Sequence, residues 1–166
     1  TAERRQLAAT GMLRSAAMMQ DDVETIAAAT DMLAEAKLTP ELRNEALYFR
    51  AKAYLNQQAD KKAMNDLQAL AKDTRTLYGA EAKYLVALQL YKAHEYAAAE
   101  KEILNFIEQS TPHAYWLARS FVLLSDVYVA MGKDLDARQY LLSLQQNYQG
   151  NDDIEQMINE RLEKLK

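Results

Sequence analysis

The stretch that decides the fold is AKYLVALQLYKAHEYAAAEKEIL, residues 82–104. It holds two runs of helix-favouring residues separated by a short polar turn. Each run carries a small residue among larger apolar ones, and such pairs, twelve positions apart, recur at intervals of 36 and 38 residues. The members of this small-residue column are Ala51 and Ala63, Ala87 and Ala99, and Ser125 and Ala137. Small side chains let two helices cross closely, so the chain is predicted to be a stack of helical hairpins.

Composition supports an all-α fold. Hydrophobic residues make up 49% of the 166 residues and charged residues 27%, which is ordinary for a folded domain. Only two prolines and four glycines are present, too few for the many turns of an all-β protein. No stretch alternates between polar and apolar residues as a half-buried strand does.

Larger apolar residues follow the same period and fill fixed places around the small ones. They stand nine residues before, and four and seven residues after, the second small residue of each pair. These positions are Tyr54, Leu90 and Tyr128; Leu67, Ile103 and Leu141; and Leu70, Phe106 and Leu144. The pattern resembles the tetratricopeptide repeat, a helix-turn-helix of nominally 34 residues. FVLLSDVYVAMGKDLDARQYLLSLQQNY, residues 121–148, adds Gly132 where that family favours glycine.

The resemblance implies a right-handed superhelical stack of about four hairpins closed by a C-terminal capping helix. We expect one array over residues 1–166, with a divergent repeat at about 3–37, repeats at 40–75, 79–110 and 112–148, and the capping helix at 151–166. In the divergent repeat, a 34-residue shift aligns Ala17 with Ala51 and Ala29 with Ala63.

Local signals predict where several helices begin. Thr39-Pro40 and Thr111-Pro112 each combine a capping hydroxyl with a proline suited to a first helical position. Gly79 is interpreted as a break between helices. Asp152, with Glu155 three residues later, is interpreted as a capping box.

The resemblance also places a binding groove. In tetratricopeptide proteins, positions two, five, nine, twelve and thirteen of each first helix face the ligand. Carried over, these positions predict a concave surface that binds a protein or peptide partner. The residues predicted to line it are Tyr48, Lys52, Leu55, Tyr84, Leu88, Tyr91, Lys92, Val122 and Asp126. Glu45, Asn56, Arg119 and Val129 occupy further groove positions.

Two interpretations of this tyrosine-rich track stay open. In one, the chain is a non-enzymatic scaffold or adaptor that binds a peptide or helix of another protein. In the other, it is a purely structural segment of a larger solenoid whose groove packs against its own chain. Family members that bind chaperone tails use lysine at position five and asparagine at position nine, where this chain has Tyr48 and Lys52. Chaperone-tail binding is therefore not expected. Tyr115 and Trp116 form a second candidate binding patch. In the alternative interpretation, Trp116 packs on Phe106 and Ile107.

No catalytic, cofactor or metal site is predicted. Cysteine is absent, the two histidines lack ligands at metal spacing, and the glycines are isolated. A net charge of −4 with dispersed lysines and arginines argues against nucleic acid. No apolar run approaches bilayer length, so direct membrane insertion is not expected.

Starting at Thr1, the chain is expected to be processed or a piece of a longer bacterial protein. Compartment and oligomeric state stay open, with the cell envelope favoured only by resemblance to envelope-associated tetratricopeptide proteins.

Overall fold

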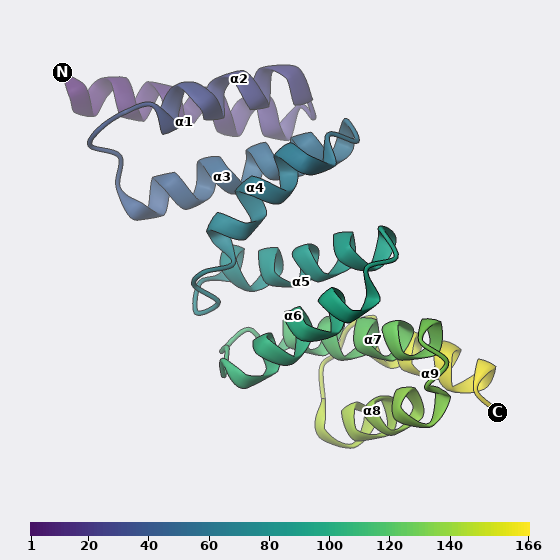
Figure 1. Cartoon of the computed structure of the whole chain (residues 1–166). Helices are drawn as coiled ribbons and strands as arrows, with labels where there is room; N and C mark the ends of the chain where they lie inside the picture. Colours follow the sequence, from purple (N-terminus) through teal and green to yellow (C-terminus); the bar gives the residue numbers. More distant parts are fainter. The chain divides into compact units, whose positions relative to one another are not determined.

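A computed structural model describes all residues, 1–166, as nine helices with no strand (Figure 1), which confirms the all-α prediction. The chain divides into two compact units, Thr1–Lys72 and Asp73–Lys166. The assignment of all hairpins to a single array extends over both units and stays a prediction. We describe each unit by itself.

Unit 1 contains two hairpins, α1 (Ala2–Met18) with α2 (Asp22–Leu33), and α3 (Pro40–Asn56) with α4 (Asp60–Leu70). α3 packs on α2 and α1, and α4 packs on α3. The core between the hairpins is formed by buried residues of α1, α2 and α3: Leu13, Ala28, Ala29, Met32 and Ala46. Three of these five are alanines, which permits close contact between helix backbones.

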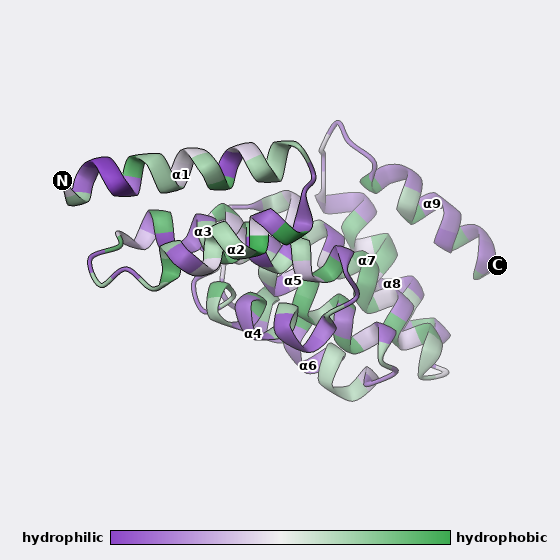
Figure 2. Cartoon of the chain, turned by 90° about the horizontal axis from the view of Figure 1, so that it is seen from above, coloured by the Kyte–Doolittle hydropathy of each residue, from purple (hydrophilic) through white to green (hydrophobic).

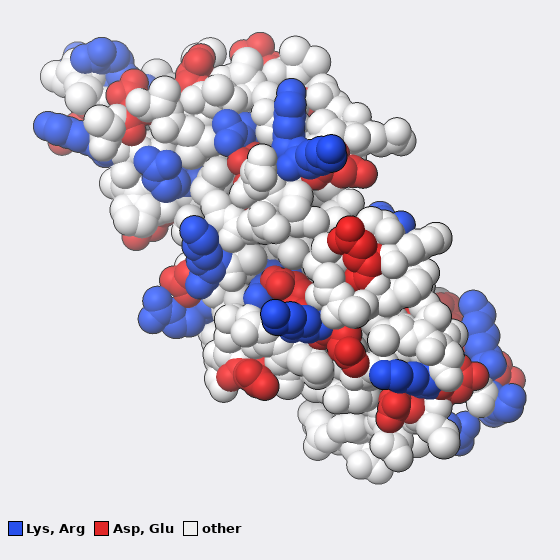
Figure 3. Space-filling view, in the orientation of Figure 1, with Lys and Arg blue, Asp and Glu red and all other residues white.

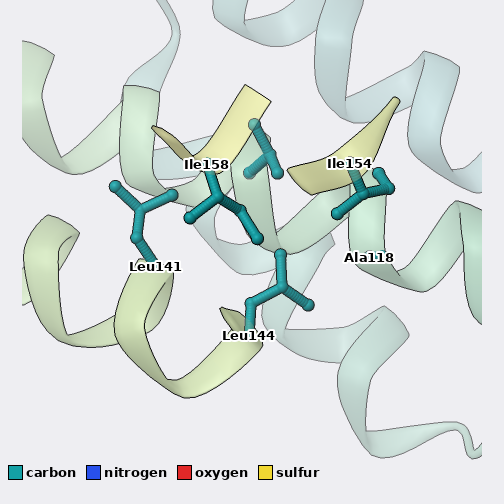
Figure 4. Packing of buried hydrophobic residues seen from close by; sticks show 6 residues of the cluster. Ala118, Leu141, Leu144, Ile154 and Ile158 are labelled. Carbon is teal, nitrogen blue, oxygen red and sulfur yellow. The ribbon is translucent and has the colours of Figure 1, made fainter. Parts of the chain in front are cut away.

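Unit 2 contains α5 (Leu77–Lys92), α6 (Tyr96–Glu108), α7 (Ala114–Ala130), α8 (Asp134–Asn147) and α9 (Ile154–Lys164). α7 packs on α5 and α6, α8 packs on α7, and α9 covers both α7 and α8. Figure 4 shows Ile154 and Ile158 of α9 directed at Leu141 and Leu144 of α8. Fully burying one such side chain contributes roughly 1.5–3 kcal/mol, so this contact holds the last helix in place.

The small-residue column is buried as its recurrence predicts. All six members, from Ala51 to Ala137, are at most 1% exposed. Ser125 satisfies its buried hydroxyl by donating to the carbonyl of Val122 at 2.6 Å. A small polar residue therefore replaces alanine here without leaving an unpaired group.

The four hairpin turns share one conformation. The first helix of each hairpin is followed by a residue with positive φ: Gln20, Gln58, His94 and Gly132. In every case the next N–H donates to the carbonyl oxygen five residues back, at 2.7–3.0 Å. This pattern defines a Schellman motif, which stops the helix and satisfies its last carbonyls. Counted between these residues, the period is 38, 36 and 38 residues.

This turn register corrects the 34-residue alignment of the first hairpin. Matching Gln20 with Gln58 shifts the alignment to 38 residues, which brings Leu13 to the place of Ala51 and Thr25 to that of Ala63. Leu13 and Thr25 are both buried, whereas Ala17 is only half-buried. In the first hairpin a large residue, Leu13, stands where the second hairpin has the small Ala51. An alignment that matches alanines with alanines therefore places the first hairpin in the wrong register.

The helix-start predictions divide into one that is correct and three that are wrong. Thr39 caps α3, accepting the Leu42 N–H at 3.2 Å, with Pro40 as the first helical residue. Gly79, in contrast, lies inside the first turn of α5, which Thr76 caps. A Cβ on Gly79 would lie 1.8 Å from the carbonyl oxygen of Asp73. Position 79 therefore requires glycine because the backbone of Asp73 lies close to it. Gly79 does not mark a break between helices.

The two other start signals are displaced by local hydrogen bonds. Thr111 donates to the Thr74 carbonyl at 2.6 Å and accepts the His113 N–H at 3.1 Å, so α7 begins only at Ala114. Asp152 accepts the Ile154 N–H at 3.0 Å, and α9 has no side-chain cap. The predicted capping box with Glu155 is therefore not formed.

Candidate protein-binding groove

In unit 1 the predicted groove residues on α3 line a real pocket. Tyr48 and Lys52, together with Glu45 and Asn56, border a hollow of about 440 Å³. Leu55 is half-buried and lies outside this hollow. Four of the five positions that the resemblance assigns to this helix therefore share one concave surface.

The pocket is walled by three helices of unit 1. α1 contributes Ala17 and Met18, α2 contributes Thr25, and α3 adds Phe49 and Ala53 between its groove positions. Met18 is among the most exposed large apolar side chains of the chain. The hollow thus combines an apolar lining with the broad faces of Tyr48 and Phe49, whose rings meet edge to face at 5.5 Å.

Charged groups of both signs surround this apolar lining. Arg14 of α1 forms a two-pronged ion pair with Glu45 of α3, at 2.5 and 2.9 Å. Lys52 Nζ lies 5.8 Å from the centre of the Tyr48 ring, within cation–π range. On the space-filling face in Figure 3, blue and red side chains are likewise interspersed. The rim can therefore orient a polar segment by charge while the lining takes an apolar side chain.

In unit 2 two of the predicted groove residues are buried. Tyr84 is 6% exposed and Val122 is 3% exposed. Arg119 of α7 covers Tyr84, with its guanidinium carbon 4.9 Å from the ring centre and a hydrogen bond of 3.0 Å to the phenol oxygen. Trp116 packs beside the same ring at 5.6 Å. These groove positions are occupied by the chain's own side chains.

Tyr91 and Asp126 lie together at a second hollow, of about 540 Å³, between α5, α7 and α9. Burial, together with the charge of Asp126, raises the pKa of Tyr91 above its usual value. Arg161 of α9 binds Asp126 in a two-pronged ion pair at 2.8 and 3.0 Å. The capping helix therefore closes part of the hollow.

Val129 of α7, a further groove position, also lines this hollow, whereas Leu88 and Lys92 do not. Leu88 is half-buried and Lys92 is exposed on the last turn of α5. Trp116 is half-buried and makes its ring contacts with Tyr84 and Tyr115, at 5.6 and 5.1 Å. The second candidate patch is therefore part of the packing around Arg119.

Sequence reasoning missed the partners that shape both hollows. Arg14, Asp22 and Arg161 come from helices to which the groove was not assigned. An alignment of the first two hairpins with a shift of 38 residues gives Arg14 the same position as Lys52. That alignment would have predicted Arg14 as a groove residue. Arg161 carried no such signal, since α9 has no counterpart among the hairpins.

No helix of the structure combines the length and the apolar character needed to cross a bilayer. No protein-family model, curated protein or solved structure matches the chain.

Proposed function

We propose that the chain is a non-enzymatic protein-interaction module of the tetratricopeptide kind, which binds a peptide or helix of another protein. The binding site in this proposal is the unit 1 pocket between α1, α2 and α3. The observation that carries the proposal is the gathering of Glu45, Tyr48, Lys52 and Asn56 around one hollow. The arrangement of all hairpins as a right-handed superhelix is part of the same proposal.

The size and chemistry of the pocket support this function. Its volume of about 440 Å³ leaves room for an apolar side chain of a partner. Tyrosine and methionine are enriched at protein interfaces because they offer large adaptable contact areas. An apolar anchor side chain of the partner would lie against Met18, Tyr48 and Phe49. The charged rim would then set the direction of the partner's backbone.

Charge reversal inside the pocket tests the proposal. Lys52→Glu reverses the charge of one residue that lines the pocket, and we expect it to reduce specific capture of a partner from a native lysate about tenfold or more. Lys61→Glu makes the same charge change on an exposed position of α4 and serves as the matched control. Equal capture by both variants, with both folded by circular dichroism, would refute the groove assignment.

A second candidate function is purely structural, and one observation in unit 2 favours it. Arg119 over Tyr84, and Arg161 on Asp126, fill groove positions with groups of the same chain. Tyr84→Ala is expected to lower stability by about 3–5 kcal/mol under either function, because the residue is buried. The Lys52→Glu variant separates the two functions if the groove has a structural role throughout. Capture by Lys52→Glu would then equal that of the native chain.

A further inference from the structure

The outer side of α1 carries a row of residues that contact neither α2 nor α3 as core. We call this row the α1 seam; it consists of Arg5, Ala8, Met12, Ser15 and Met19, with alternating spacings of three and four residues. Met12 is 59% exposed and Met19 is 76% exposed. The seam borders a shallow hollow of about 460 Å³, to which no residue of the unit 1 pocket contributes.

Two of these five positions are buried in α3 and α7, whereas the α3 counterparts of Met12 and Met19, Arg50 and Gln57, are half-buried and exposed. In the turn register, Ala8 and Ser15 correspond to Ala46 and Ala53 of α3, which are at most 3% exposed. α3 packs on α1 and α2 through this side. The equivalent residues of α7, Ser120 and Val127, are also fully buried. The α1 seam thus has the composition and spacing of a helix-packing surface, and Figure 2 shows apolar residues along α1 beyond its hydrophilic first turn.

Charge is distributed unequally along this surface. Arg4 and Arg5 lie in the first turns of α1, whereas Asp21 and Glu24 border the hollow at the opposite end. At 1.5 Å per residue, the arginines and the acidic end are roughly 20 Å apart. A helix that covers the seam must therefore be acidic beside the arginines and basic at its other end. A second copy presents this distribution when its α1 runs in the antiparallel direction, because Asp21 and Glu24 follow α1 at the turn and in the first turn of α2.

We propose that the occupant of the α1 seam is the α1 seam of a second copy of this chain, packed antiparallel about a two-fold axis near Met12. Arg4 and Arg5 of each copy then lie beside Asp21 and Glu24 of the other. Met12 meets its counterpart at the axis, and Ala8 and Ser15 permit close approach. Gly11 lines the same hollow and carries no side chain.

Engineered cysteines test the two-fold axis directly, because the native chain has no cysteine. Met12→Cys is expected to form a disulfide-linked dimer of twice 18.9 kDa under mild oxidation. Leu135→Cys, at an even more exposed apolar residue of α8 (77% against 59% for Met12), is the control and is expected to stay monomeric. Equal yields from the two variants, or no dimer from Met12→Cys, would overturn the proposal.

A charge exchange tests the antiparallel direction in the otherwise native chain. By sedimentation equilibrium, Arg5→Glu should raise the dimer Kd about tenfold, since both equivalent contacts become repulsive. Adding Glu24→Arg to the same chain should restore the native Kd. This rescue cannot arise within one copy, because Arg5 lies near the start of α1 whereas Glu24 lies in the first turn of α2, beside the far end of α1. A native chain that sediments as a monomer up to millimolar concentration contradicts the proposal, as does a double variant no tighter than Arg5→Glu.

Discussion

Enlarging one member of the small-residue column probes the physical basis of the hairpins. Ala99 of α6 is fully buried, and α6 packs against α5 and α7. Ala99→Leu adds three carbons where no exposed surface exists to receive them. Overpacking of this kind costs about 1–3 kcal/mol, because neighbouring side chains must leave their preferred rotamers. We expect the free energy of unfolding of unit 2 to fall by that amount.

The only tryptophan, Trp116, lies on α7 and makes its fluorescence a probe of this unit. Urea unfolding followed at the tryptophan emission should show a lower midpoint for Ala99→Leu with an unchanged slope. Ala98→Leu introduces the same side chain at an exposed neighbouring position and should shift stability by less than about 0.5 kcal/mol. An unchanged midpoint for Ala99→Leu, or equal losses for both variants, would refute the reasoning.

Three further predictions concern single sites. Gly79→Ala should lower the unfolding free energy by about 1–3 kcal/mol in urea titrations, because its Cβ would meet a backbone oxygen. Arg161→Leu breaks the ion pair with Asp126 and should speed amide hydrogen exchange in α9 while leaving α6 unaffected. Burial and a hydrogen bond to a carboxylate raise the pKa of Tyr148 to about 12. The folded chain holds this proton more tightly than the unfolded chain, so stability should fall as pH rises from about 10 to 12, and less so for Tyr148→Phe.

The helices were predictable because their apolar periodicity and small-residue column are strong local signals. Ala51, Ala87 and Ser125 recur at nearly constant intervals, and all are buried. The register of the first hairpin was not predictable from alanines alone, because Leu13 takes the place of a small residue. Its turn, with Gln20 in the left-handed region, reveals the register only in three dimensions.

The candidate site was predictable where one helix supplies its residues. Tyr48 and Lys52 lie one turn apart on α3, so their common side follows from helix geometry. The burial of Tyr84, which removes it from the predicted groove, was not predictable. It depends on a contact with Arg119, which belongs to the next hairpin. Ion pairs across 35 residues, such as Arg161 with Asp126, leave no periodic mark in the sequence.

Site-specific photocrosslinking gives the most direct test of partner binding in the unit 1 pocket. A photoreactive phenylalanine analogue replaces Tyr48 inside the pocket or Lys61 outside it, and each chain is irradiated in native lysate. Binding in this pocket predicts a discrete crosslinked protein from position 48, lost when Lys52→Glu is added, and none from position 61. A crosslink pattern that is the same from both positions, or absent from position 48, would contradict the account.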